Sequence, residues 1–420
     1  MQVAAPQVTT GNRWRFVFAA LVMQLCLGVL YSWAVFRGPL AQAYGWPKTD
    51  TIAPYRYSLL FFTFAMIAGG YWQDRKGPRV VGTAGGLMLT LGCLLAAWMG
   101  NTPWGLVASY GVVGGLGMGL AYVTPIATCI KWFPDKRGLI VGLAVMGFGS
   151  GSLIFAPLLE SMIGHDPARF AETIPRTFLI MACMFFVFVI GAAQFYRVPP
   201  AGWRPQGWAP PAAASGKIDF TPGEMLRTWQ VWAMWALYFL GSSVGLTAIG
   251  ESTPLVQEMA KAGALLSGGA ALGLMSLCNG LGRLGWGTIS DRVGRNRALA
   301  AMFTIYIVAL LALLRGAATF APLQAGLCLV GLCFGGFLAI LPALTADYFG
   351  PKNLGANYGM VFSAYGLSGF FVPGYFASIM EAARQSGALA EGYNTVYHTL
   401  AVMAGVGFLL ALLVRRPRST

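Results

Sequence analysis

Apolar stretches follow one another along almost the whole chain, separated by proline, glycine and charged residues. Each stretch is about 20 residues long, the length at which a helix crosses the roughly 30 Å hydrocarbon core of a bilayer. Only 10% of the 420 residues are charged, compared with about 25% in soluble domains. The pattern therefore predicts an all-α membrane protein.

Twelve membrane-spanning helices are expected from this pattern. Their predicted bounds are residues 14–36, 56–73, 79–99, 104–130, 138–160, 175–196, 229–250, 264–289, 297–314, 320–346, 354–377 and 395–414. The first sixteen residues, MQVAAPQVTTGNRWRF, lack a short apolar core followed by a small-residue cleavage site. No removable signal peptide is expected.

The basic residues are distributed unevenly between the two sides of the membrane. Twelve crossings place both termini on one side, and that side carries 19 of the 28 basic residues but only six of the 14 acidic ones. An excess of Lys and Arg marks the cytoplasmic face. We therefore expect cytoplasmic termini, and we attribute the net charge of +14 to topology and anionic lipid rather than to a nucleic-acid partner.

One motif occurs twice at matching positions. Residues 70–79 read GYWQDRKGPR and residues 287–297 read GTISDRVGRNR, with Asp74 and Asp291 217 positions apart. Similar offsets relate WFPDKRG to YFGPKNLG, and the two tryptophans that open the halves. Repeated features at one offset indicate duplication of a six-helix unit.

The duplication predicts two helical bundles and a connecting segment. The N-terminal six-helix bundle is expected over residues 1–196 and the C-terminal one over residues 229–420. Residues 197–228 are rich in Pro, Ala and Gly, which is typical of a linker. The even number of crossings places this linker in the cytoplasm.

The repeated Asp-Arg motif suits a gate on the cytoplasmic side. Glycines allow helices to approach closely and the chain to turn tightly, and an aspartate is stabilised at the N-terminus of a neighbouring helix. The alternative is a signal for topology and folding alone. The residues to which we assign the gating role are Gly70, Asp74, Arg75, Gly287, Asp291 and Arg292.

The two motif copies, the twelve helices and the central linker resemble the major facilitator superfamily of transporters. This resemblance extends over the whole chain. It implies two bundles that rock around a substrate site at the membrane midplane, and it implies no enzymatic activity.

Arg283 stands alone in an otherwise apolar or small-residue run. It precedes Asp291 by eight residues, which places it about 12 Å inside the core at 1.5 Å per residue. Insertion of a charge there costs about 2.5–3.5 kcal/mol, so such residues usually face a cavity. A side chain of about 6–7 Å does not reach the interface, and acidic residues occur only at the ends of the predicted spans.

A fixed guanidinium in a cavity predicts an anionic ligand, because Arg offers two parallel donors to a carboxylate. Asn279 lies four residues earlier on the same helical face, where its amide can orient the guanidinium or contact the ligand. We expect a small carboxylate to bind at Arg283 and Asn279.

Four aromatic residues are expected to line the same cavity. Tyr122 lies at the depth of Arg283, and Tyr31, Phe334 and Tyr365 lie in the middle or outer parts of their helices. Each has the alternative of packing inside the bundle or facing lipid.

Several stretches carry a narrower resemblance, among them LYSWAVF, NGLGRLGWGTISDRVGR and ANYGMVFSAYG. They are similar to the branch of oxalate–formate antiporters and monocarboxylate transporters, and most similar to bacterial proton-coupled L-lactate transporters. Oxalate carriers bind a dianion with an arginine and a lysine. Arg283 matches the arginine, but Tyr365 stands where the lysine would be, which implies a single carboxylate.

Eukaryotic monocarboxylate carriers differ from this chain at two positions. They have an aspartate where this chain has Asn279 and a lysine where it has Val35, so their proton relay does not transfer. His398 is the only histidine within a predicted span, and histidine is the side chain most often used to carry a proton in proteins, which makes it the candidate proton carrier beside the substrate itself. Its alternative role is packing at the interface.

The resemblance implies symport of a lactate- or pyruvate-type monocarboxylate with a proton across the cytoplasmic membrane of a prokaryote. Exchange of organic anions is the first alternative, and a non-transporting membrane sensor is the second. We expect a monomer whose partners are the carboxylate, the proton and the lipid bilayer. The seven cysteines form no C-x-x-C pair, so neither a disulfide, a metal site nor a cofactor is expected.

Overall fold

The computed structural model of the protein describes residues 13–200, 203–205, 219–260, 268–314 and 320–417. Residues 201–202 and 206–218 of the predicted linker and the start of the predicted span 264–289 lie outside these residues. The N-terminal elements are α1 (Trp14–Leu27), η1 (Gly28–Trp33), α2 (Ala34–Tyr44), α3 (Lys48–Lys76), α4 (Pro78–Met99), α5 (Pro103–Leu106), η2 (Val107–Gly114), α6 (Gly115–Trp132), α7 (Arg137–Ile163), η3 (Pro167–Arg169), α8 (Phe170–Met184), η4 (Phe185–Val189) and α9 (Ile190–Ala193). The C-terminal elements are α10 (Pro222–Leu226), α11 (Trp229–Ala260), α12 (Gly268–Val293), α13 (Arg295–Val308), η6 (Ala309–Leu314), α14 (Phe320–Phe349), α15 (Leu354–Gln385) and α16 (Leu389–Leu413).

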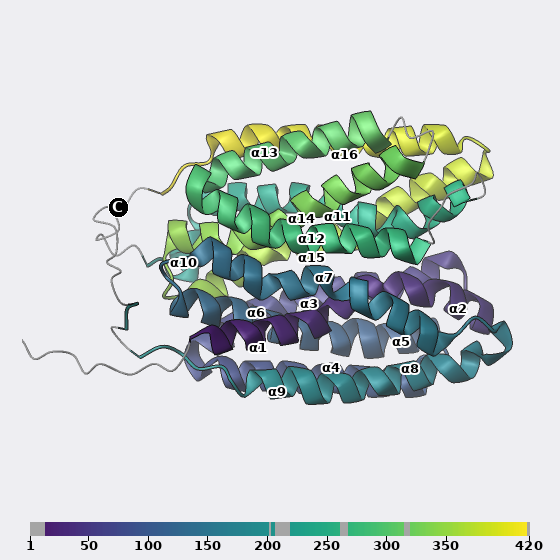
Figure 1. The fold of residues 1–420 in the computed structure, drawn as a ribbon, viewed down its shortest axis with the longest axis horizontal. Coiled ribbons are helices and arrows are strands. Elements are labelled where there is room, and N and C mark those ends of the chain that lie inside the picture. Colours follow the sequence, from purple (N-terminus) through teal and green to yellow (C-terminus); the bar gives the residue numbers. More distant parts are fainter. Residues whose placement is uncertain (1–12, 201–202, 206–218, 261–267, 315–319, 418–420) are drawn as a thin grey trace, which may run out of the picture.

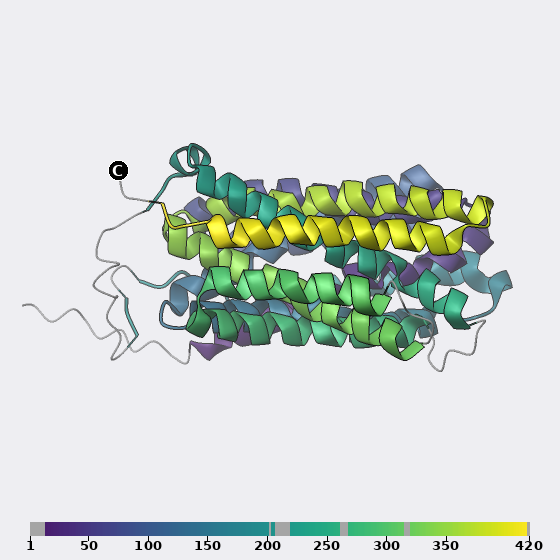
Figure 2. The same cartoon turned by 90° about the horizontal axis from the view of Figure 1, so that it is seen from above.

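Consecutive elements join into twelve long helices within the described residues, and these run along one axis (Figures 1 and 2). Eleven of them are long and apolar enough to cross a membrane. The twelfth, α12, contains several glycines together with Asn279 and Arg283, which makes it less apolar. The predicted all-α membrane fold is confirmed.

The two sequence halves form two groups of helices. In Figure 1, α1 to α9 lie on one side of the molecule and α11 to α16 on the other. Two helix pairs make the main contacts between the groups, α3 with α15 and α7 with α12. The start of α1, the end of α16 and the short α10 lie at one end of the bundle. We call it the basic end, because most of the Lys and Arg residues are expected on the side of the membrane that holds both termini.

Several helices extend beyond their predicted bounds. The helix predicted from residue 56 begins at Lys48, directly after Pro47, and the helix predicted to end at residue 36 continues to Tyr44. Hydropathy detects only the part of a helix inside hydrocarbon, whereas backbone hydrogen bonding continues into the polar interface. The bounds from the sequence were therefore too narrow at these ends.

The first crossing contains a 3-10 segment, η1, which separates α1 from α2. Gly28 at its start lies against α7, where an added Cβ atom would be 2.5 Å from the carbonyl oxygen of Phe148. A 3-10 segment inside a longer helix changes the direction of its side chains. Here it carries Tyr31, which is buried.

Part of the predicted linker folds against the C-terminal half at the basic end. The carbonyl oxygen of Phe220 accepts hydrogen bonds from the side-chain amides of Asn353 (3.0 Å) and Asn357 (3.1 Å). Next to it, Thr221 and Glu224 form a capping box at the start of α10. Hydrogen bonds from the backbone N–H and the hydroxyl of Thr221 lower the pKa of Glu224.

Candidate functional site

Arg283 is fully buried on α12, where this helix packs against α7 of the other half. Its Nε donates a hydrogen bond to Oδ1 of Asn279, and its Nη1 donates one to the carbonyl oxygen of Val145, both at 2.9 Å. The guanidinium carbon lies 5.2 Å from the centre of the Phe148 ring. Among the described residues, no carboxylate lies within ion-pair distance of Arg283. Only neutral groups contact the charge, so it remains available to an anion.

Three buried donors near this point have no hydrogen-bond partner among the residues that the structure describes. They are Nη2 of Arg283, Nδ2 of Asn279 and the hydroxyl of Tyr122. The guanidinium also interacts electrostatically with the hydroxyl groups of Tyr31 and Tyr122. A buried donor without a partner costs about 1–3 kcal/mol, and such groups in native proteins call for an explanation. A carboxylate ligand, which only accepts hydrogen bonds, would supply the missing partners.

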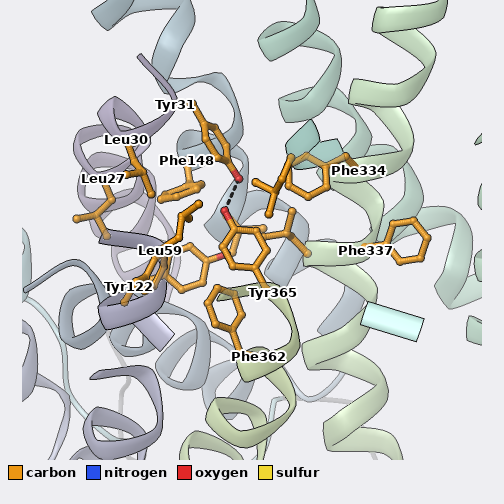
Figure 3. Packing of buried hydrophobic residues seen from close by; sticks show 14 of the residues in the cluster. Leu27, Leu30, Tyr31, Leu59, Tyr122, Phe148, Phe334, Phe337, Phe362 and Tyr365 are labelled. Atoms are coloured by element: carbon orange, nitrogen blue, oxygen red, sulfur yellow. Dashed lines mark hydrogen bonds between the residues drawn. The ribbon is translucent and has the colours of Figure 1, made fainter. Parts of the chain in front are cut away.

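Phe148, whose ring lies 5.2 Å from the guanidinium carbon of Arg283, belongs to a cluster of aromatic rings from both halves. Phe62 on α3, Tyr122 on α6, Phe148 on α7 and Phe362 on α15 pack together, with ring centres 5.1 Å apart for three of the pairs. Figure 3 shows Tyr122, Phe148 and Phe362 of this cluster. These closely packed rings leave little space next to Arg283, so the arrangement favours a ligand of only a few atoms.

The hydroxyl groups of Tyr31 and Tyr365 point toward one another at 2.9 Å (Figure 3). Phe334 on α14 stacks on Tyr365 with ring centres 6.2 Å apart and planes 8° from parallel. The structure thus brings together the six residues expected at the substrate site. They are Tyr31, Tyr122, Asn279, Arg283, Phe334 and Tyr365.

A narrow space adjoins Asn279 at this site and has no room for a water molecule. Its lining residues are Tyr31, Ile249, Leu272, Met275, Ser276 and Asn279. A separate small space, with room for about one water molecule, lies within the C-terminal half between α11, η6, α14, α15 and α16, and no charged side chain lines it. The donor groups that could bind an anion therefore lie at Arg283, in the closed centre of the protein.

His398 lies apart from these residues. It is exposed on α16, which packs mainly on α13 and α11 of its own half. Sequence alone places His398 inside a span but does not determine which face of the helix carries it. In the structure it does not line the space around Arg283.

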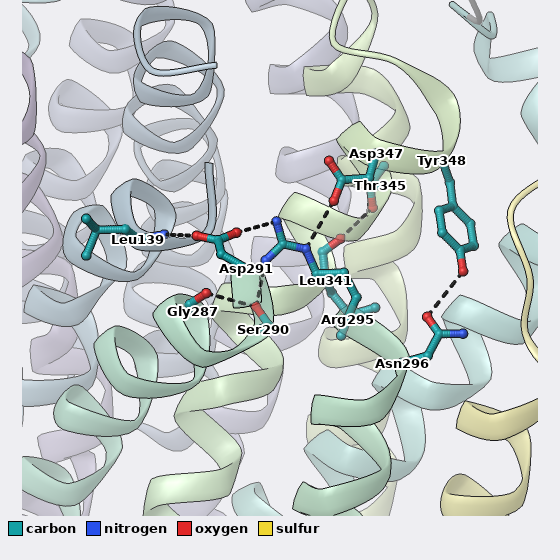
Figure 4. Close-up of polar contacts among 10 residues, drawn as sticks. All are labelled: Leu139, Gly287, Ser290, Asp291, Arg295, Asn296, Leu341, Thr345, Asp347 and Tyr348. Carbon is teal, nitrogen blue, oxygen red and sulfur yellow. Dashed lines mark hydrogen bonds and ion pairs between the residues drawn. The ribbon is translucent and has the colours of Figure 1, made fainter. Parts of the chain in front are cut away.

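The two aspartates of the repeated motif occupy equivalent places at the basic end. Asp74 accepts a hydrogen bond from the backbone N–H of Ala356 at 3.2 Å, in the first turn of α15. Asp291 accepts one from the N–H of Leu139 at 3.1 Å, in the first turn of α7 (Figure 4). Each carboxylate therefore caps a helix of the opposite half, where the helix dipole favours negative charge.

The glycines of the motif lie at close approaches between the halves. A Cβ atom on Gly70 would clash with the carbonyl oxygen of Gly355, and one on Gly287 would lie 2.6 Å from the carbonyl oxygen of Gly138. These contacts join α3 to α15 and α7 to α12. A larger side chain at either position would hold the basic end apart.

The turns that follow the aspartates require glycine. Gly77 has φ of 86° and Gly294 has φ of 94°, values that residues with a Cβ atom rarely adopt. The two arginines beside the aspartates, Arg75 and Arg292, are exposed, and Arg75 lies over the Tyr71 ring at 4.0 Å. Neither arginine contacts the aspartate of its own motif through an ion pair among the described residues.

Other charged residues hold the aspartates. Lys131 pairs with Asp74 at 2.9 Å, whereas Arg295 bridges Asp291 at 2.6 Å and Asp347 at 3.0 Å (Figure 4). Lys131 and Asp347 are 216 positions apart, so they correspond in the repeat but carry opposite charges. Neither residue is among the functional residues predicted above, although the repeat offset relates the two positions.

Comparison with known proteins decides the family. The model of the Major Facilitator Superfamily matches residues 16–373 and 268–420. The chain belongs to this superfamily. It is a membrane transporter and not an enzyme.

Two curated relatives of this transporter are named for carboxylates. The oxalate:formate antiporter of Oxalobacter formigenes is 30% identical over 407 residues, which cover 96% of this chain and 92% of the relative. The apicoplast pyruvate carrier 1 of Toxoplasma gondii is 27% identical over 72% of this chain and 64% of its own. The predicted branch of the superfamily is therefore confirmed.

Solved structures of superfamily members share the fold. A human organic anion transporter, MFSD10, superimposes with a TM-score of 0.71 at 17% identity, covering 96% of this chain and 100% of that one. The proton:xylose symporter XylE superimposes with the same score at 14% identity, covering 95% and 94%. These similarities establish the arrangement of helices. The substrate has to be inferred from the residues of the site.

Proposed function

We propose that the protein is a secondary active transporter that carries a small monocarboxylate of the lactate or pyruvate type together with a proton. The observation that carries this proposal is Arg283, a buried guanidinium at the boundary between the halves with Nη2 unpartnered. Arg binds carboxylates through two parallel hydrogen bonds. Alternating access then follows from rocking of the two halves around this central residue.

The number of positive charges supports a monocarboxylate. Arg283 is surrounded by neutral side chains, and Tyr365 provides a hydroxyl where a second cation would be needed for a dicarboxylate. The close aromatic packing of Phe148 and Tyr122 suits a ligand with a short apolar part. Formate, pyruvate and lactate have this chemistry.

We infer that His398 does not carry the proton. His398 is exposed on α16, and no carboxylate pairs with Arg283 among the described residues. When one monocarboxylate anion and one proton cross together, their charges cancel. The cycle is then electroneutral.

The basic end is the cytoplasmic end in this proposal, because Lys and Arg accumulate on the cytoplasmic side. Asp74 and Asp291 hold that end closed by capping helices of the opposite half. The transporter works as a monomer in the cytoplasmic membrane of a prokaryote, with both termini in the cytoplasm.

Uptake of labelled L-lactate into proteoliposomes tests the proposal. The vesicles contain no organic anion, and uptake is measured with and without an imposed inward proton gradient. We expect the gradient to stimulate uptake, and we expect Arg283→Gln to abolish the stimulated part. Normal lactate or pyruvate uptake by Arg283→Gln would contradict the proposed site.

Organic-anion exchange is the second candidate. A relative named as an oxalate:formate antiporter matches 96% of this chain. In an exchange cycle, a bound anion neutralises the charge of Arg283 during both the inward and the outward step. Exchange predicts uptake only when vesicles hold a counter-substrate. Uptake into empty vesicles therefore separates the two candidates.

A further inference from the structure

A charged side chain joins the two halves at the end of the bundle opposite the basic end, which we call the outer end. Arg56 lies on α3, eight residues or about 12 Å after the start of this helix at Lys48. Its Nε donates a hydrogen bond to the carbonyl oxygen of Phe370 on α15 at 3.0 Å, and its guanidinium carbon lies 5.0 Å from the centre of the Phe370 ring. An arginine of one half therefore binds the backbone of the other half near the outer end.

The acceptor lies next to an interruption of α15. Pro373 is inside this helix, and proline has no N–H to bond to the carbonyl four residues earlier, that of Gly369. Helices bend at such positions. Arg56 contacts the same turn from both sides of the proline, because a Cβ atom on Gly374 would lie 2.8 Å from the guanidinium carbon. The arginine thus holds α15 where the helix lacks a backbone hydrogen bond.

Only neutral groups contact the charge of Arg56 within the part of the chain that the structure describes. No carboxylate there lies within ion-pair distance of it, and its side chain is half-buried. Tyr57 packs edge-on against the same Phe370 ring, with ring centres 5.4 Å apart. The contact between the halves can therefore break and re-form without the separation of an ion pair.

The internal repeat provides a comparison for this contact. At the offset of 217 positions between the two motif copies, Arg56 corresponds to Gly273 on α12, and Phe370 corresponds to Leu153 on α7. The equivalent residues also lie together, since a Cβ atom on Gly273 would be 3.6 Å from the Leu153 side chain. Their contact is apolar and therefore not directional. Of these two equivalent places, only the one between α3 and α15 has a directional bond.

We propose that Arg56 is a latch for the outer end. Its bond to the Phe370 carbonyl holds the outer part of α15 against α3, and loss of this bond lets α15 bend outward at Pro373. The latch concerns the shape of the transporter and does not depend on the substrate that Arg283 binds. It also differs from the closure of the basic end, where both equivalent places have a capping aspartate.

The distance between the halves at the outer end tests the latch. Spin labels are placed at Asn101, in the turn between α4 and α5, and at Ala382, near the end of α15, and both positions are exposed. The background has its seven native cysteines replaced. Pulsed electron resonance records the distance distribution in lipid nanodiscs without any substrate.

Arg56→Leu removes the latch. We expect the ratio of longer to shorter label distances to rise about fivefold, the effect of losing one hydrogen bond. Gly374→Ala is an independent variant that keeps the charge, because its Cβ atom pushes the flexible guanidinium away from Phe370. It should shift the ratio in the same direction, and it provides the test if Arg56→Leu does not fold. The combined variant should shift the ratio no further than Arg56→Leu alone, since both changes act on one bond.

Leu153→Ala is the matched control, because it removes only the apolar contact at the equivalent place, and it should keep the wild-type ratio. A wild-type ratio in folded Arg56→Leu or in Gly374→Ala overturns the inference, and so does an equal shift in Leu153→Ala. These results leave the proposed carboxylate site intact, because no substrate enters the measurement. Failure of lactate uptake, in contrast, would overturn the proposed function and leave the latch.

Discussion

The hydroxyl groups of Tyr31 and Tyr365 are 2.9 Å apart, although 334 residues separate them along the chain. Tyr31 comes from the 3-10 segment of the first crossing and Tyr365 from the middle of α15, so their hydrogen bond joins the two halves next to Arg283. The pair closes the centre without adding charge. The Tyr31–Tyr365 pair therefore affects how many carboxylate groups a bound substrate can have.

Replacing Tyr365 by lysine should change the preferred substrate. Tyr365→Lys places a second cation near Arg283, and a hydrogen bond to a charged group is worth about 1.5–3 kcal/mol. We expect the affinity for oxalate to rise about tenfold or more relative to lactate. Competition of oxalate against labelled lactate measures the change, and Tyr365→Phe is the control that removes only the hydroxyl. Unaltered selectivity in the lysine variant would show that Tyr365 does not face the ligand.

Loss of the Arg283 charge should nearly eliminate transport. Arg283→Gln removes two charge-assisted hydrogen bonds, and at 1.5 kcal/mol or more each the loss is about 100-fold in kcat/KM. Arg283→Lys keeps the charge but lacks the planar fork, so we expect an intermediate value. Initial uptake rates provide the measurement. Arg169→Gln, at an exposed position outside the helix core, should behave as the wild type.

A methyl group at the motif glycines should prevent closure of the basic end. Gly70→Ala would clash with the carbonyl of Gly355, and Gly287→Ala would bring a Cβ atom within 2.6 Å of the carbonyl oxygen of Gly138. Gly285→Ala is the matched control on α12, since its Cβ would meet nothing within 4 Å. We expect uptake to fall at least tenfold in the first two variants, because the closed state becomes strained, and to persist in the third. Equal rates in all three would rule out tight closure at these positions.

The charged residues at the basic end should differ in importance. Asp291→Asn loses the ion pair with Arg295 and weakens the bond to the Leu139 N–H of the other half. Asp347→Asn loses the ion pair with Arg295, and partly exposed ion pairs contribute about 0–1 kcal/mol. The first change should therefore slow uptake more than the second. A larger effect of Asp347→Asn, with both proteins equally stable in thermal unfolding, would contradict this order.

Removal of His398 should leave proton coupling intact. Its side chain is exposed on α16, away from the contacts between the halves. We expect His398→Gln to take up lactate at the wild-type rate and with the same dependence on external pH. Loss of stimulation by the proton gradient in this variant alone would restore His398 as the proton carrier.

Some properties of the molecule follow from local chemistry and were predictable. The length of the apolar stretches dictates membrane helices, because unpaired backbone groups are not tolerated in hydrocarbon. The repeated offset between Asp74 and Asp291 indicates two six-helix units. Arg283 stands out by itself, because a lone charge so deep in the membrane requires a functional explanation. Each of these features can be evaluated from the order of the residues alone, without knowledge of which helices pack together.

Other properties depend on which helix faces meet. His398 and Tyr122 both lie within helices, yet Tyr122 packs in the centre and His398 is exposed. Hydropathy reports depth in the membrane but not rotation about the helix axis in a helix that is apolar on all sides. The roles of Lys131 and Asp347, which carry opposite charges, follow from their ion-pair partners, Asp74 and Arg295, which only the structure identifies.

The sequence by itself indicated that the chain crosses the membrane in two related halves and carries one arginine deep inside an apolar segment, because apolar length, repeat spacing and the cost of a buried charge can all be evaluated from the order of the residues. Only the tertiary structure decided what contacts that arginine. Val145, Phe148 and Gly149 approach Arg283 from the other half. Their approach results from the packing of α7 on α12, which the positions of these helices in the sequence do not indicate.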